Sequence, residues 1–308
     1  PAISAGLALV LMEVVSDFGT VEYFAVETLT LGIFKVWLGM NNIFAAAQIS
    51  LVGFVFILSL LGLELYARSR QRFSSTTSKT NKLQPLMLRG RGQALCLAIC
   101  CLPLVFGFFI PVGVLLKFVL TGQAWANLVA VAGVVTGSGS VAILAALLVM
   151  VISTLIVLAA TYRGGEMLRR MAMLASTGYA VPGTMLAIGV LIFAGAIDRI
   201  YAGLVGDGRA SLLLGGLGIL IVAYLVRFQA VGYGAVLSGI RRLPDNMMGA
   251  SRVLGNGFAG SLQRVILPLL RGSIMAGGLL VFVDVLKELP MTLLLRPFDF
   301  ETLATYTY

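Results

Sequence analysis

Long apolar stretches alternate along the chain with shorter segments that carry most of its charged residues. A helix needs about 20 residues to cross about 30 Å of hydrocarbon, and most of these stretches approach that length. The stretches cover residues 1–12, 43–63, 94–116, 140–160, 171–197, 210–226 and 272–283. The pattern predicts an all-α protein, a polytopic transmembrane helical bundle with seven spans in this chain.

The fourth apolar stretch is part of a longer uncharged run between Lys117 and Arg163. That run is too long for a single span. We therefore expect the span at 140–160, preceded by an interfacial helix at 124–136. The glycines between the two segments would form the bend.

A proline followed by a glycine interrupts the fifth apolar stretch, between Tyr179 and Thr184. Proline removes a backbone donor and disturbs the preceding helical turn. The interruption is compatible with a kinked span or with a broken helix that lines a transport path. In the second interpretation, Tyr179 and Pro182 are candidate path residues.

Composition and charge fit a membrane protein better than a soluble one. Apolar residues make up 59% of the chain and charged residues only 11%, which is more apolar surface than one soluble core could bury. If the spans alternate in direction, most basic residues fall in loops on one side, which the positive-inside rule makes cytoplasmic. These residues are Arg68, Arg70, Arg72, Lys79, Lys82, Arg89, Arg91, Arg163, Arg169, Arg170, Arg227, Arg241, Arg242, Arg252, Arg264 and Arg271. These basic residues are spread over three loops and do not form one patch. We therefore interpret the net charge of +9 as a sign of membrane topology and expect no nucleic-acid partner.

The residues of enzyme and metal sites are scarce. Histidine is absent, which removes the usual general base and the commonest metal ligand. Cys96, Cys100 and Cys101 lie inside an apolar stretch, and we interpret them as small hydrophobic residues of a span. We expect no enzymatic activity, no firm metal site and no cofactor bound by this chain.

The first and last spans are related by an internal repeat. Six residues of the first span recur in the last at one constant offset: Ile3, Ala5, Gly6, Leu9, Val10 and Val14 correspond to Ile274, Ala276, Gly277, Leu280, Val281 and Val285. After a short insertion, Glu27, Thr28 and Leu29 recur as Glu301, Thr302 and Leu303. Both spans would run in the same direction, which makes the repeat parallel.

The repeat predicts a domain organisation. Residues 1–70 would be the C-terminal part of a first transmembrane domain, with two spans, and 94–308 a second domain with five. Residues 71–93, rich in Ser, Thr and Lys, would be the cytoplasmic linker. The sequence starts at Pro1 and ends at Tyr308 without a tail, so we expect a fragment that lacks about four N-terminal spans and the last span.

Two pairs of acids occupy equivalent positions in the repeat. Glu13 and Asp17 form one pair and Asp284 and Glu288 the other, each four residues apart and so on one helix face. They are candidates for lining an outer vestibule or gate, where carboxylate oxygens would suit a hard cation. The alternative is a solvated helix end, with Lys287 neutralising one pair.

The predicted cytoplasmic stretch between Arg227 and Arg271 carries a spaced pattern of small and apolar residues. Its members are Gly249, Ala250, Ser251, Gly255, Val265, Leu267 and Pro268. The spacing resembles the EAA loop of type I ABC importer permeases, with Gly249 in place of the acid and Ser251 in place of alanine. The resemblance implies a short helix, a turn at Gly255 and a second helix, which together dock on an ATPase subunit. The alternative is an ordinary basic loop.

Further stretches resemble permeases of ferric iron importers that contain two fused transmembrane domains. They are Met12-Glu13, Ser16 to Phe24, Gly178 to Thr184, Ala223 to Phe228, Lys287 to Pro290 and Leu293 to Pro297. Such permeases are similar to those for thiamine and phosphonates. The resemblance covers nearly the whole chain and implies the type I ABC importer permease fold.

The same resemblance implies a function and partners. The chain would be a permease component of the bacterial inner membrane that forms the translocation path, with ferric iron as the predicted substrate. Its partners would be two ATPase subunits, which use ATP, and an extracytoplasmic substrate-binding protein. An ion-coupled secondary transporter or channel is the alternative that the spans alone also allow.

Overall fold

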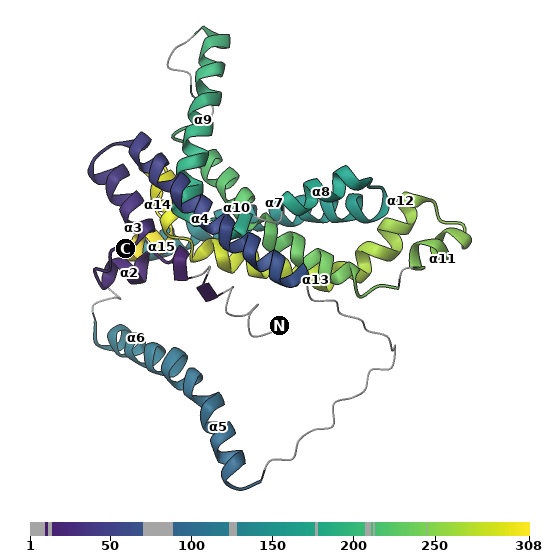
Figure 1. Cartoon of the computed structure of the whole chain (residues 1–308), viewed down its shortest axis with the longest axis horizontal. Helices are drawn as coiled ribbons and strands as arrows, with labels where there is room; N and C mark the ends of the chain where they lie inside the picture. The colour runs from purple at the N-terminus through teal and green to yellow at the C-terminus, as the bar shows by residue number, and fades with distance from the viewer. Residues whose placement is uncertain are drawn as a thin grey trace. The chain divides into compact units, whose positions relative to one another are not determined.

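The computed structural model of the chain is built from helices, with no strand among the residues it describes (Figure 1). The described residues are 10–11, 14–69, 89–122, 128–175, 178–206, 211, 213–244 and 246–308. The chain divides into two compact units, one of residues 1–70 with 134–308 and one of residues 71–133. The predicted all-α class is confirmed.

The smaller unit contains the third predicted span. Helix α5 (Arg91–Leu104), the π-helical turn η2 (Val105–Phe109) and α6 (Ile110–Thr121) follow one another without a break. The π-turn begins two residues after Pro103, whose missing N–H removes one helical hydrogen bond. Together the three segments make an apolar helix of 31 residues, long enough to cross a membrane.

Five helices among the described residues are long and apolar enough to span a bilayer. They cover Arg91–Thr121, Val131–Tyr162, Gly183–Val205, Leu217–Ile240 and Phe258–Leu286. The second predicted span is α4 (Ile43–Ser69), which is an apolar helix over its first part, Ile43–Ser59. The first predicted span lies mostly outside the described residues. The predicted polytopic transmembrane bundle is confirmed.

Shorter elements connect the long helices of the larger unit. They are α2 (Gly19–Tyr23), α3 (Leu29–Phe34), η1 (Lys35–Gly39), α8 (Glu166–Ala175), η4 (Gly178–Ala180), α11 (Met247–Val253), α12 (Phe258–Ser261), η5 (Leu262–Ile266), α14 (Pro290–Leu295) and α15 (Leu303–Thr307). The spans themselves are α7 (Leu128–Tyr162), α9 (Gly183–Val205), α10 (Leu217–Ile240) and α13 (Leu267–Leu286).

Helix α7 corrects the predicted division of the fourth stretch. It runs unbroken through Gly137 and Gly139, where we had expected a bend. In hydrocarbon the backbone groups freed by a bend would find no water, so glycine alone does not interrupt a helix there. The hydroxyls of Ser138 and Ser140 donate to the helix carbonyls of Val134 and Gly137, at 2.7 and 2.8 Å.

The fifth predicted span begins later than expected. Helix α8 ends at Ala175, a short 3₁₀ turn follows, and α9 starts at Gly183 directly after Pro182. Proline at this position cannot continue a preceding helix, since its ring clashes with the turn before it. The interruption is therefore a break between two helices and not a kink within one span.

The sixth predicted span is also displaced. Helix α10 runs from Leu217 to Ile240, so the charge of Arg227 did not end the span as predicted. Only 7% of Arg227 is exposed. A basic residue is tolerated at such a place when a buried acid neutralises it, and Arg227 has such a partner, described below.

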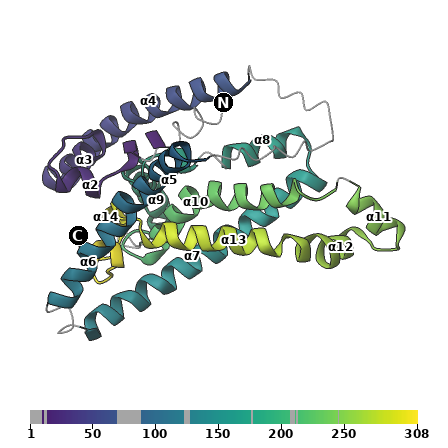
Figure 2. The same ribbon diagram turned by 90° about the horizontal axis from the view of Figure 1, so that it is seen from below.

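Helices α10 and α13 pack side by side and form the centre of the larger unit (Figure 2). Their core also includes buried residues of α7, α9 and α14. A Cβ atom added at Gly277 would lie 2.7 Å from the Cβ of Ala235 and 3.0 Å from Cε of Met150. Small residues thus allow the close approach of these helices.

This contact predicts that Gly277→Leu destabilises the protein by about 1–3 kcal/mol, the usual cost of overpacking. Gly272→Leu is the matched control on the same helix, because no atom lies within 4 Å of a Cβ added there. Thermal unfolding of the two purified full-length variants in detergent checks the prediction. Equal melting temperatures for the Gly277→Leu and Gly272→Leu variants would show that the α10–α13 contact accommodates a large side chain.

Candidate functional site

A cavity of about 420 Å³ lies in the larger unit, between segments that the internal repeat relates. One wall contains residues 16–19 and another residues 287–290, which are equivalent at the offset that relates the first and last spans. The polar and charged groups that line it include Ser16, Asp17, Thr20, Tyr179, Arg227, Lys287 and Glu288. A cavity between two repeat copies is the usual place for a transport path.

The structure brings together three of the six candidate path residues at this cavity, namely Asp17, Tyr179 and Glu288. Pro182 is buried and directly precedes α9. Asp284 lies in the last turn of α13 and faces Lys287, whereas Glu288 follows the end of that helix, so the two acids do not share a helix face as predicted. The remaining candidate, Glu13, lies outside the described residues.

A buried ion pair forms one side of the cavity. Nε of Arg227 lies 3.4 Å from Oε2 of Glu288, and the two side chains are 9% and 7% exposed. The Arg227 Nη1 group also donates to the carbonyl of Val181, at 3.3 Å, in the break before α9. Arg227 therefore joins α10 to both the break and the segment after α13.

The Arg227–Glu288 pair occupies the space where a side chain at position 183 would lie, and Gly183 has no side chain. A Cβ atom at Gly183 would lie 2.5 Å from Oε1 of Glu288 and 2.7 Å from Nη1 of Arg227. Any side chain here would displace at least one charged group. The Pro182-Gly183 sequence thus ends one helix and lets the next begin against the ion pair.

Both acids of the second pair face cations. Lys287 Nζ lies 3.1 Å from Oδ1 of Asp284, as the alternative interpretation of these acids predicted. Glu288 faces Arg227. No group of three or more His, Cys, Asp or Glu side chains that could hold a metal ion lies within the described part of the chain.

Asp17 and Glu288 occupy equivalent positions in local structure as well as in sequence. Oδ1 of Asp17 accepts from the backbone N–H of Thr20, at 3.4 Å, where α2 begins. Oε1 of Glu288 accepts from the N–H of Met291, at 3.3 Å, where α14 begins. Acidic groups are favoured at helix N-termini because they satisfy free N–H donors and interact with the helix dipole.

The Glu-Thr-Leu motifs of the repeat also fold alike. Thr28 caps α3 by accepting from the N–H of Leu31, at 3.4 Å, and Thr302 caps α15 by accepting from that of Thr305, at 3.3 Å. The glutamate before each cap pairs with a base, Glu27 with Lys35 and Glu301 with Arg296. A hydrogen bond from Thr305, together with Arg296, lowers the pKa of Glu301.

The two repeat copies contact each other beside the cavity. The hydroxyl of Tyr308, at the end of α15, donates to Oε1 of Glu22 in α2, at 2.8 Å. The Phe18 and Tyr308 rings lie 6.1 Å apart. Burial, with a further contribution from Glu22, raises the pKa of Tyr308 to about 12, so this hydroxyl remains a donor at neutral pH.

The segment after α10 forms a helix–turn–helix. Helix α11 ends at Val253, the chain turns at Gly255, whose φ is +87°, and α12 begins at Phe258. Glycine suits this turn because a side chain is strained at positive φ. The hydroxyl of Ser251 donates to that of Ser261, at 2.9 Å, and this buried bond closes the turn.

The predicted loop residues divide into exposed and packed groups. Gly249, Ala250 and Gly255 are exposed, and so are the neighbouring apolar side chains Val253 and Leu254, by 88% and 82%. The packed group contains Val265 in η5, half-buried, and Leu267 at the start of α13. Pro268 stands in the first turn of α13, where a missing N–H costs no helical bond.

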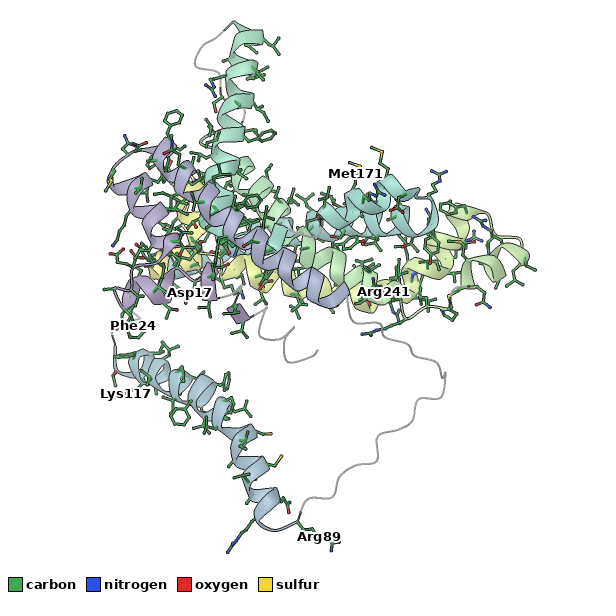
Figure 3. The ribbon with its side chains drawn as sticks, in the orientation of Figure 1. Asp17, Phe24, Arg89, Lys117, Met171 and Arg241 are labelled. Atoms are coloured by element: carbon green, nitrogen blue, oxygen red, sulfur yellow. The ribbon has the colours of Figure 1, made fainter. Side chains whose placement is uncertain are left out.

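The helix–turn–helix is anchored to the end of α7. The guanidinium carbons of Arg163 and Arg252 lie 5.5 and 5.7 Å from the centroid of the Phe258 ring. Tyr162, Met248 and Ile266 belong to one hydrophobic cluster beneath it. Figure 3 shows Arg241, at this end of α10, and Asp17 toward opposite ends of the larger unit.

No protein-family model matches the chain. A curated relative is the Fe(3+)-transport system permease protein FbpB 2 of Haemophilus influenzae, which is 23% identical over 309 aligned positions. The chain resembles an Fe(3+)-transport permease. The alignment covers 99% of the chain and 58% of the relative, so the chain spans little more than half of that protein's length.

This similarity confirms the resemblance that the sequence motifs indicated. With the five apolar helices, it identifies the chain as part of a multi-pass protein of the bacterial inner membrane. The relative is a permease, which is a component of a transport system.

Sequence reasoning missed Arg227 as a site residue. It treated this arginine as the start of a cytoplasmic loop, whereas the side chain lies inside α10 and lines the cavity. The signal was present in the uncharged run from Phe228 to Ile240, which continues the apolar stretch beyond the arginine. A single charge inside so long a run indicates a buried functional residue.

Proposed function

We propose that the chain is part of the permease of a binding-protein-dependent ABC importer, and that its substrate is ferric iron. The observation that carries the proposal is the helix–turn–helix between α10 and α13, with its EAA-like spacing and exposed apolar tip. The substrate proposal rests on the name of the similar Fe(3+)-transport permease.

The exposed residues of the helix–turn–helix would dock on an ATPase subunit. Gly249 and Ala250 present little side chain, which permits close approach, and Leu254 offers an apolar contact beside the turn. Two ATPase subunits would bind ATP and hydrolyse it, and this chain would bind no cofactor. Arginines 241, 242 and 252 around the loop favour the cytoplasmic side for this face.

The cavity between the repeat copies would belong to the translocation path. It is lined by Arg227 and Phe228 near the middle of α10, away from the loop, where substrate delivered by an extracytoplasmic binding protein would pass (Figure 3). Asp17, Tyr179 and Glu288 would line this path, while Asp284 and Pro182 would support its walls. Residues 1–70 and 94–308 would belong to successive transmembrane domains joined by the linker 71–93.

The proposal is tested with the full-length permease in liposomes, together with its ATPase and substrate-binding protein. We expect uptake of ferric iron that requires ATP and the binding protein and continues without an ion gradient. Parallel assays with thiamine and a phosphonate test the substrate. Uptake that needs an ion gradient and ignores ATP would favour the ion-coupled transporter instead.

A further inference from the structure

One hairpin of helices connects the exposed loop with the cavity. Helix α10 leads into the loop at Arg241, and α12, η5 and α13 lead back from it. The two arms are in close contact near the loop, where a Cβ atom at Gly239 would lie 2.6 Å from the Ser273 hydroxyl. They are again in close contact at Gly277 and Ala235. Such packing lets the arms move as one body.

The buried ion pair connects the middle of α10 with the end of α13 that is far from the loop. Arg227 belongs to the first arm, and Glu288 follows directly after the second. Both line the cavity. The Val181 carbonyl adds a third element, the break before α9, to the same arginine. The pair therefore lies where the hairpin meets the cavity wall.

The chemistry of the pair favours two discrete arrangements. Nε of Arg227 makes no hydrogen bond of good geometry, although it lies 3.4 Å from the glutamate oxygen. Separating the charges within apolar surroundings would leave both unpaired, which is strongly unfavourable. Separation therefore requires that the cavity open and hydrate both groups. Elements with two such arrangements are suited to conformational switching.

We propose that the Arg227–Glu288 pair transmits movement of the α10–α13 hairpin to the cavity, so that ATPase action at the loop opens and closes the path. Arg227 is then a positioning residue for transport. This inference rests on the proposed function, because it requires an ATPase at the loop.

The test uses the full-length permease, its ATPase and its binding protein in liposomes, in a cysteine-free background with one cysteine replacing Thr20 on the cavity wall. A water-soluble thiol reagent reports exposure of this position with and without ATP. The central variant is the double substitution Arg227→Met with Glu288→Leu, which removes both charges and so leaves no unpaired ion. Arg227→Lys keeps the charge but loses the guanidinium fork. Arg199→Met is the control, an exposed arginine of α9 that bonds within its own helix.

We expect ATP to change the labelling rate about tenfold in the parent protein and the Arg199→Met control, a typical size for coupling between sites. In the double variant, ATPase binding and hydrolysis should persist while labelling no longer responds to ATP and uptake is lost. Arg227→Lys should give an intermediate response. A full ATP response in the double variant would overturn the inference. If the parent protein binds no ATPase, the proposed function itself fails, and the inference fails with it.

Discussion

Replacing Arg227 alone by methionine is expected to destabilise the larger unit by about 3–5 kcal/mol, because it leaves the carboxylate of Glu288 buried without its partner. Neither side chain is more than 9% exposed, so water cannot replace the lost guanidinium without rearrangement. The carbonyl of Val181 would lose its donor as well. The expected result is a sharp loss of full-length protein that is monodisperse after extraction in detergent.

A matched exposed pair provides the control for this stability prediction. Lys35 and Glu27 lie 2.6 Å apart, but their side chains are 52% and 74% exposed. Lys35→Met should therefore cost less than about 1 kcal/mol. Adding Glu288→Leu to Arg227→Met should recover most of the lost stability. Equal melting temperatures for the Arg227 and Lys35 single variants would show that the buried pair does not hold the fold.

Introducing a charge at Leu254 is expected to abolish binding of the ATPase. This side chain is 82% exposed beside Gly255 and contributes to the apolar tip of the helix–turn–helix. A glutamate there would be desolvated in a docked complex, at a cost of several kcal/mol unless a base pairs with it. Association should weaken by about 100-fold or more when the change costs about 3 kcal/mol.

Leu204 gives the control for that substitution. It lies near the end of α9 and is 81% exposed, close to the value for Leu254. Leu204→Glu therefore makes the same chemical change on a surface outside the loop. Both full-length variants should insert and purify alike, and co-purification of the ATPase should separate them. Loss of the ATPase from both variants, or from neither, would count against docking at the loop.

The helical class and most spans could be predicted because membrane spans follow from composition and length alone. The helix–turn–helix was predictable for a local reason. Gly255 permits a turn that other residues resist, and Pro268 suits the first turn of the next helix. The repeat could be recognised in the sequence because the two copies keep the same residues at structurally equivalent positions. Thr28 and Thr302, for example, cap equivalent helices.

The parts that sequence reasoning missed depend on contacts between distant residues. Nothing local to Arg227 shows that Glu288 neutralises it, so the charge was taken for the end of a span. The continuity of α7 through Gly137 likewise reflects the lack of water around a membrane helix, which overrides the preference of glycine for bends. The position of the cavity could not be predicted, because it depends on how the two repeat copies pack against each other.

The positions of the acids illustrate the same limit. Their spacing predicted a shared helix face, but Asp284 is turned toward Lys287 and Glu288 toward Arg227. Spacing along a helix constrains neighbours three or four residues apart and gives no information about a cation from another helix. At the end of α13 the structure therefore shows two acids that are each paired with a cation.

Site-specific cross-linking tests the central claim, that this chain is moved by a partner ATPase, most directly. A photoreactive phenylalanine analogue would replace Leu254 in the full-length permease, with Leu204 substituted in the same way as the control. The account predicts cross-links from position 254 to the ATPase subunits, strengthened or weakened by ATP, and no such cross-links from position 204. If position 254 forms no cross-link to the ATPase in a preparation that still transports ferric iron, the result would contradict the claim that the ATPase docks at the loop.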